Sequence, residues 1–416
     1  MREAGNNYRW EGVSIASLIA KNWTYLRNMG NSDFRDVFLK GPGPAPVVDG
    51  GARLARNREA IEAAVGWMRY IQGRQPDGGI AGFVWFNKGL PTVSGSYPET
   101  TGYSIPTMYD YASRYDDGSA RAAAARAADF LLPLQGADGS FPGGLVGELT
   151  GPSVFNTAQV VDGLLRAYIE TGDRRYRDAA SKSCGWICDA QEEDGSWGRF
   201  NYLGAKRVYD TKVSEILLKV HAVMGGERLS RSAERNLGWV LSKQEENGWF
   251  NDCDNSSTLV HIPLTHTIGY TVQGLLESYL LLRRRELLTA AERTLSSLLE
   301  AFGPGDRLLS ARYRSDWQPA AKYSCVTGDA QISICWSLLH SIVDDDRYLR
   351  AASRMNDLLA SIQLRSRVPE MSGALTSSWP VNGDYFPYRI NNWTVKYFVD
   401  ALLIEQVAAQ APPGGR

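Results

Sequence analysis

Six residues with reactive or polar side chains recur at nearly even spacing along the chain. They are Glu99, Asn156, Asp210, His266, Cys325 and Asn392, separated by 57, 54, 56, 59 and 67 residues. Two carboxyl groups across a cavity are the minimum for glycoside hydrolysis, one as general acid and the other as base or nucleophile. We therefore predict Glu99 and Asp210 as a catalytic pair, with Asp329 as an alternative carboxylate. His266 and Tyr270 are predicted to carry protons beside them.

A second chemistry fits the same positions. Abstraction of the C5 proton of a uronic acid needs a neutralised substrate carboxylate and an acid–base pair. Asn156, Arg389 or Asn392 could clamp the carboxylate, and His266 with a tyrosine could move the proton. The reaction would then be that of a lyase or an epimerase, and the residue types do not separate it from hydrolysis. Asn156 and Asp210 are also good helix N-caps, which is their structural alternative.

Aromatic residues are concentrated in six long connecting segments. The segments 73–99, 136–155, 192–209, 245–265, 303–326 and 364–393 hold 20 of the 44 aromatics in 140 of the 416 residues. Flat rings with polar edges suit sugar binding, so we predict a substrate-binding cleft. Its predicted binding residues are Trp85, Tyr103, Asn156, Trp317, Tyr385, Tyr388, Arg389, Asn392 and Trp393. For Trp197 and Trp249, packing between repeats is the favoured explanation.

A zinc site is a weaker alternative for part of this region. Asp252, Cys253, His261 and His266 lie within fifteen residues, and zinc takes such ligands. The spacing matches no CxxC or HxxxH pair, so the sequence predicts no metal and no cofactor. Cys325 beside a histidine could be a nucleophile, but nothing in the sequence lowers its pKa.

Internal repetition predicts the elements that must position these residues. A glutamine near a helix end followed by a glycine turn recurs at Gln72, Gln135, Gln191 and Gln244, and Gln363 closes the series. Each glutamine ends an amphipathic helix, and a second, nearly all-apolar helix follows each long segment. Twelve alternating helices in six pairs predict an all-α (α/α)6 toroid over residues 51–416. Residues 1–50 are predicted to form an N-terminal helical extension.

Composition excludes several classes of partner. The chain has 416 residues, 44% hydrophobic and 22% charged, with a net charge of −1, so bulk charge does not favour nucleic acid. No apolar run approaches the ~18 residues of a membrane span, and charged residues interrupt the N-terminal stretch where a signal peptide needs apolar ones. Five cysteines without a framework spacing fit a reducing compartment. We therefore expect a cytoplasmic location; the oligomeric state is left open.

The repeats resemble those of a known superfamily. The stretch from Gln191 to Trp197, Gln-x-x-Asp-Gly-Ser-Trp, resembles the QW-type repeats of squalene cyclases and protein prenyltransferase β subunits. The cyclases' Asp-x-Asp-Asp motif is missing, and Asp344-Asp345-Asp346 falls in a short turn at the wrong end of the ring. The prenyltransferase zinc set is matched only loosely by Asp252, Cys253 and His266. The resemblance implies an α/α toroid and makes isoprenoid chemistry an alternative.

The C-terminal stretch carries a second resemblance. Residues 383–402, Gly-Asp-Tyr-Phe-Pro-Tyr followed by Asn-Asn-Trp-Thr-Val-Lys-Tyr-Phe-Val-Asp-Ala-Leu, look like the end of toroid proteins encoded with bacterial exopolysaccharide biosynthesis genes. That resemblance implies a polysaccharide or glycolipid substrate and places Tyr385, Tyr388, Asn392 and Trp393 in a site segment. The alternative for Trp393 is that it merely closes the ring.

Three functions remain open on the sequence alone. The first is a carbohydrate-active enzyme, a glycoside hydrolase or a uronate lyase or epimerase. The second is a terpene cyclase- or prenyltransferase-like enzyme, and the third is a glycan-binding or scaffold protein without catalysis.

Overall fold

The computed structural model describes residues 50–85, 91–255, 262–305 and 307–410. The predicted N-terminal extension at residues 1–50 therefore lies outside the described residues except for its last position.

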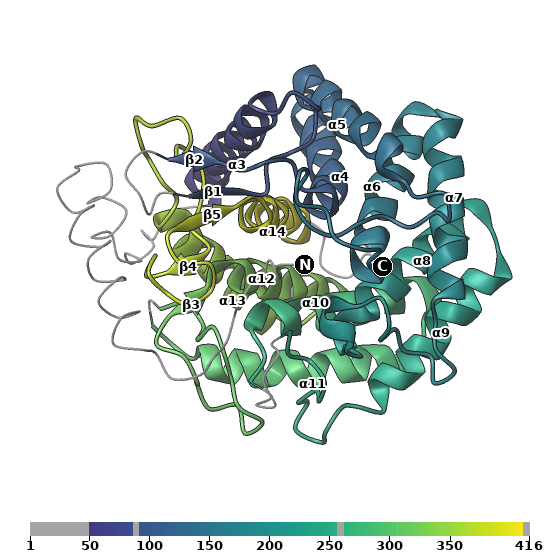
Figure 1. Ribbon diagram of the computed structural model, residues 1–416. Helices are drawn as coiled ribbons and strands as arrows, with labels where there is room; N and C mark the ends of the chain where they lie inside the picture. Colours follow the sequence, from purple (N-terminus) through teal and green to yellow (C-terminus); the bar gives the residue numbers. More distant parts are fainter. Residues whose placement is uncertain (1–49, 86–90, 256–261, 306, 411–416) are drawn as a thin grey trace, which may run out of the picture.

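The described residues form twelve α-helices in two concentric rings, which confirms the (α/α)6 toroid (Figure 1). The inner ring contains α4 (Pro98–Tyr115), α6 (Val154–Thr171), α8 (Thr211–Met224), α10 (Thr265–Leu282), α12 (Val326–Val343) and α14 (Asn392–Gln410). The outer ring contains α3 (Gly50–Gly73), α5 (Gly118–Leu131), α7 (Arg174–Asp189), α9 (Glu227–Leu241), α11 (Arg285–Phe302) and α13 (Asp346–Ser361). Each inner helix packs on the next, and α14 returns to α4, so the ring closes.

The turns from inner to outer helices are short. Only two residues separate α4 from α5, α6 from α7 and α12 from α13. A left-handed residue ends the first helix and an aspartate caps the next, as in Gly172 followed by Asp173. Asp344 and Asp345 serve the same purpose between α12 and α13, at the end of the ring opposite the long loops.

The repeated glutamines hold neighbouring outer helices together. The Gln72 amide donates to the carbonyls of Gly78 in its own turn and Ala123 on α5, both at 2.9 Å. Gln191 and Gln244 bond in the same way to the next outer helix. Gln363 closes the ring by donating to Ala60 on α3 at 2.9 Å. The repeated glutamines therefore have a structural role, because each ties the turn after its own helix to the next outer helix.

The long loops gather at one end of the ring, and short strands join them. In a three-stranded sheet, β1 (Phe83–Trp85) lies between β2 (Thr92–Val93) and β5 (Arg389–Asn391), both antiparallel to it. A second pair joins β3 (Ser324–Cys325) to β4 (Ser378–Trp379). The pairing of β1 with β5 fixes the first long loop against the last one.

No helix in the described part of the chain is long and apolar enough to cross a membrane.

Candidate active site

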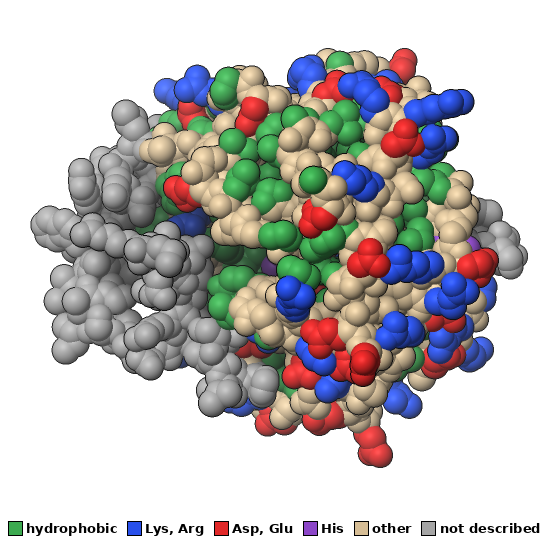
Figure 2. Space-filling view, turned by 45° about the vertical axis from the view of Figure 1, so that its right-hand side comes forward, with side chains coloured by type: hydrophobic (Ala, Val, Ile, Leu, Met, Phe, Trp, Pro, Cys, Tyr) green, Lys and Arg blue, Asp and Glu red, His purple; other side chains and the backbone are tan. Residues whose placement is uncertain are grey.

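Aromatic rings from the first and last loops surround the entrance of the ring. Phe83 on β1 lies 5.2 Å from Trp393 on α14 and 5.6 Å from Phe386, measured between ring centroids. Tyr97, just before α4, lies 6.3 Å from Trp393. We call this group, Phe83, Tyr97, Phe386 and Trp393, the mouth. Figure 2 shows a recess near the centre of this face, with hydrophobic side chains at its border.

Glu99 lies just inside the mouth, where its environment favours the protonated acid. It is the second residue of α4, which begins at Pro98, a residue suited to the first helical position. Its side chain is half-buried, and burial raises the pKa of Glu99 to about 7, while a hydrogen bond with Tyr97 acts in the opposite direction. A carboxyl group with such a pKa can both give and take a proton near neutral pH.

His266 is held as a neutral imidazole. It is the second residue of α10 and has 8% of its surface exposed. Its Nδ1 lies 2.6 Å from Oε1 of Gln331 on α12, and burial lowers the pKa of His266 to about 4. Its ring lies 4.4 Å from Tyr270 and 5.8 Å from Tyr385. A neutral histidine with residual exposure can accept a proton.

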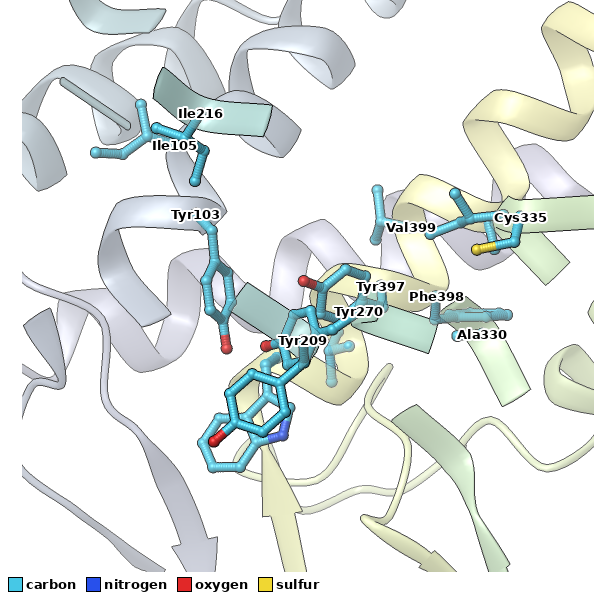
Figure 3. Close-up of a cluster of buried hydrophobic side chains, with 14 of the residues drawn as sticks. Tyr103, Ile105, Tyr209, Ile216, Tyr270, Ala330, Cys335, Tyr397, Phe398 and Val399 are labelled. Atoms are coloured by element: carbon cyan, nitrogen blue, oxygen red, sulfur yellow. The ribbon is translucent and has the colours of Figure 1, made fainter. Parts of the chain in front are cut away.

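Three tyrosines form a floor below these two groups. Tyr270 lies 5.9 Å from Tyr397, which lies 5.9 Å from Tyr103. Figure 3 shows their hydroxyl groups turned toward one another, with Tyr209 beside Tyr270. Burial raises the pKa of all three floor tyrosines well above the ordinary value, so they stay protonated, and Tyr270 shares hydrogen bonds with Tyr397 and Tyr103.

Several predicted binding residues do border this space. Asn156 is 8% exposed, accepts a hydrogen bond from Ser153 at 3.0 Å and bonds with Tyr97. The indole of Trp393 donates to the Tyr385 hydroxyl at 2.8 Å. The Arg389 guanidinium lies about equally far from the rings of Phe83, Trp85 and Phe386. Arg389 and Trp85 are paired across strands β1 and β5.

The predicted second carboxylate is sealed off. Asp210 has no exposed surface, and one of its oxygens accepts a hydrogen bond from the Asn201 amide at 2.6 Å. Asp329, the alternative, is also fully buried and accepts hydrogen bonds from the Leu309 N–H at 3.1 Å and from the Ser324 hydroxyl. Neither carboxylate can touch a substrate in this conformation, so the expected pair of Glu99 and Asp210 is not brought together at an accessible site.

Three other predicted binding residues have hydrogen bonds or packing contacts within the protein that give them a structural role. The Asn392 amide donates to the Ala81 carbonyl at 2.9 Å and the Thr100 hydroxyl at 2.7 Å, with no surface exposed. Trp317 packs on Trp249 at 5.4 Å between ring centroids and donates to the backbone carbonyl of Asn247. The Tyr388 side chain is 4% exposed and belongs to the hydrophobic core.

Three of the four candidate zinc ligands, Asp252, Cys253 and His266, have other partners. Asp252 forms an ion pair with Lys243 at 3.2 Å, and the Cys253 thiol lies 3.6 Å from the Thr271 hydroxyl. The described residues contain no group of three histidine, cysteine, aspartate or glutamate side chains that could hold a metal. His261 lies outside them.

Sequence reasoning missed several members of the site. Tyr397 follows Trp393 by four residues on α14, the spacing that also places Tyr103 after Glu99 and Tyr270 after His266. That shared spacing was the signal for the floor. Tyr97 immediately precedes α4, and nothing in its local sequence distinguishes it from the other loop aromatics. Gln331 has no local signal, because its partner lies 65 residues away.

Comparison with known families places this architecture. Residues 51–273, more than half of the chain, match the family described as the squalene-hopene cyclase C-terminal domain. The chain belongs to the squalene-hopene cyclase C-terminal domain family. This membership confirms the predicted toroid superfamily, and the family match ends within α10, so α11 to α14 lie beyond it.

Solved structures resemble this member of the family over nearly the whole toroid. An unsaturated glucuronyl hydrolase specific for heparin matches with a TM-score of 0.69 and 13% identity, covering 86% of this chain and 98% of that one. Cellobiose 2-epimerase from Bacillus thermoamylovorans matches with a TM-score of 0.68 and 12% identity, covering 86% and 99%. A Bacillus unsaturated glucuronyl hydrolase responsible for glycosaminoglycan degradation matches with a TM-score of 0.64 and 15% identity, covering 83% and 96%. At such identities the likeness concerns the fold. The comparison with curated proteins finds no match.

Proposed function

We propose that the protein is a carbohydrate-active enzyme that moves protons on a polysaccharide or its glycolipid precursor, with Glu99 as the acid and His266 as the base. The observation that carries the proposal is that Glu99 and His266 both interact with Tyr270, whose ring lies 4.4 Å from that of His266, and that burial tunes the two groups in opposite directions. Burial raises the pKa of Glu99 to about 7 and lowers that of His266 to about 4. At neutral pH one group can therefore hold a proton while the other can accept one.

The lining suits a sugar. The partly exposed rings of Phe83 and Phe386 lie beside Trp393 at the mouth, where flat faces suit a sugar, and the floor below contributes tyrosine hydroxyl groups that are themselves only 1–5% exposed. Arg389 brings a positive charge to the mouth, which would attract the carboxylate of a uronic acid. The solved toroid structures that resemble this one include enzymes acting on glucuronyl and cellobiose substrates, which supports the same substrate class.

Proton abstraction fits the site better than hydrolysis by two carboxylates. Asp210 and Asp329 are sealed in the protein, so the second carboxylate of that mechanism has no candidate among the predicted residues. In the proposed reaction His266 Nε2 takes the C5 proton of a uronate and the C5–H bond breaks. Glu99 then either returns its proton to C5 on the opposite face, which is epimerisation, or protonates the departing O4 as the C4–O4 bond breaks, which is elimination.

A second candidate is an isoprenoid cyclase, and two observations favour it. The family is that of squalene-hopene cyclases, and the mouth is dominated by aromatic rings, which attract cationic groups. Glu99 in its acid form would then protonate an alkene carbon. The missing Asp-x-Asp-Asp motif and the polar floor weigh against this candidate.

Incubation with a panel of uronate-containing and neutral polysaccharides in deuterated water tests the proposal. New reducing ends with ultraviolet absorbance indicate elimination, and deuterium at C5 without cleavage indicates epimerisation. New reducing ends without absorbance or deuterium would show hydrolysis and contradict proton abstraction. Glycan binding without any of these would indicate a binding or scaffold protein.

The isoprenoid candidate is tested in parallel by incubating the protein with squalene. Cyclised products from the wild type but not from Glu99→Gln would favour the second candidate and overturn the first. A part in exopolysaccharide biosynthesis, which the C-terminal resemblance implies, and a cytoplasmic location, which the cysteine usage and the charged N-terminal stretch led us to expect, belong to the same proposal. Fractionation of the native cells tests the location directly.

A further inference from the structure

Glu99 and His266 occupy equivalent positions in two different repeats. Each is the second residue of its inner helix, with a glycine three residues later and a tyrosine four residues later. The next inner helix along the chain carries a buried glutamine as its sixth residue in both cases, Gln159 on α6 and Gln331 on α12. One of these glutamines contacts the reactive side chain, and the other has no such hydrogen bond.

Gln331 reaches His266 because the helices approach closely. A Cβ at Gly269 would lie 2.8 Å from the Cβ of Gln331 and 3.1 Å from its Oε1, so glycine is the residue that leaves room for the amide. At Gly102, the equivalent position on α4, the close neighbours are backbone atoms of Gln159 and Val160. The glutamine amide therefore faces the reactive residue at the second pair only.

The bond to Gln331 decides which ring nitrogen carries the proton. The atom within 2.6 Å of Nδ1 is the amide oxygen, which can only accept a hydrogen bond. A neutral imidazole that donates from Nδ1 must have its lone pair on Nε2. Among the described residues, Gln331 is the one hydrogen-bond partner of the His266 ring.

We propose that Gln331 is a positioning residue that holds His266 as the Nδ1-protonated tautomer and so presents a bare Nε2 to the cavity as the proton acceptor. The tautomer follows from the orientation of the Gln331 amide, whose oxygen faces Nδ1, whereas its use as a base rests on the proposed function. A carboxamide suits this purpose because it fixes the tautomer without adding charge. A carboxylate at the same place would favour imidazolium instead, since an opposite charge stabilises the protonated ring.

Nitrogen NMR of the ring-labelled protein tests the tautomer without any substrate. The chain has four histidines, so the spectrum is sparse, and His266→Gln assigns the signal. We expect His266 as the Nδ1–H form at pH 7. Gln331→Met should lose that preference, and Gln331→Glu should make His266 titrate above its ordinary pKa of 6.5 rather than near 4. Gln159→Met, the matched buried control, should leave the His266 signal unchanged.

Two results would overturn the proposal. One is an Nε2–H tautomer in the wild type, and the other is a His266 signal that Gln331→Met does not alter in a folded protein. Activity supplies a separate readout once a substrate is found. Gln331→Met should then lower kcat by up to ~10²-fold, which is the contribution of general-base catalysis, with little change in KM. If the tautomer is confirmed but no substrate turns over, the proposed function fails and the positioning inference stands.

Discussion

At the scale of single residues, burial moves the pKa values of the site in opposite directions for one reason. Loss of water penalises the charged form of any group, so a carboxyl group becomes a weaker acid and an imidazole becomes a weaker base. The pKa of Glu99 rises to about 7 and that of His266 falls to about 4, while the floor tyrosines keep their protons. The sequence predicted Glu99 and His266 as reactive by their chain position, but burial cannot be read from position. For the same reason, chain position alone grouped the fully buried Asp210 with Glu99 and His266.

Substitution of Glu99 by glutamine should abolish proton transfer and leave the fold intact. Glutamine has the shape of a protonated carboxyl group but cannot give up a proton, so turnover should fall by ~10²–10⁴-fold. Steady-state kinetics and thermal unfolding at pH 5 measure the two effects. Equal turnover in Glu99→Gln and the wild type would remove Glu99 from the mechanism.

The same variant should reveal the buried acid in the pH dependence of stability. The folded pKa of Glu99, about 7, lies above its ordinary value of 4.5, so the native state binds this proton more tightly than the unfolded state. Stability therefore falls as pH rises from 4.5 to 7 and is constant above. Glu99→Gln lacks this loss, so it should match the wild type near pH 4.5 and exceed it above pH 7.

Urea unfolding at several pH values measures that difference. His266 contributes the opposite slope, because its folded pKa of about 4 lies below 6.5 and stability is lost as pH falls through that interval. Subtracting the two titration curves removes this contribution, since both proteins contain His266. A difference that stays flat across the range would show that Glu99 ionises normally.

At the scale of helices, the sequence predicted which elements exist better than where each begins. The repeated glutamines and the two helix types define the ring. The predicted opening residues, however, occupy different helical positions, with Asp210 before the first residue of α8, Asn392 as the first residue of α14 and Asn156 as the third of α6. Each step along a helix turns a side chain by ~100°, so an error of one or two residues aims it elsewhere. Helix starts depend on loop packing, which no local pattern contains.

Asn392 shows what such a residue does instead. Its amide joins the start of α14 to the first long loop at Ala81 and to α4 at Thr100. Asn392→Leu should leave these acceptors without a donor and lower the free energy of unfolding by about 1–3 kcal/mol. Urea unfolding measures the loss, and His266 tautomer spectra should stay unchanged. A variant as stable as the wild type would contradict the structural assignment.

At the scale of the whole molecule, the site depends on closure of the ring, because its walls come from both ends of the described chain. Phe83 and Trp393 meet at the mouth only where β1 pairs with β5, and the first and last outer helices meet through Gln363 and the ion pair of Arg53 with Asp357. A linear array of the same repeats would hold His266 but would leave the mouth open. The sequence predicted closure from the number of repeats, whereas the strand pairing that seals it was not visible in segments of two or three residues.

Two buried glutamines allow the contact that closes the ring to be compared with a contact between outer helices that follow one another in the chain. Gln72 and Gln363 each donate to two backbone carbonyls at 2.8–2.9 Å, but Gln72 joins outer helices adjacent in the chain and Gln363 joins the last to the first. Replacing either by methionine leaves two carbonyls unpaired, so both variants should lose about 1–3 kcal/mol of unfolding free energy. Hydrogen exchange should separate them, because Gln72→Met loosens α3 and α5, whereas Gln363→Met loosens α3 and α13 together with β1 and β5 at the mouth. Exchange that increases only in the turn after Gln363 would mean that the other contacts suffice to close the ring.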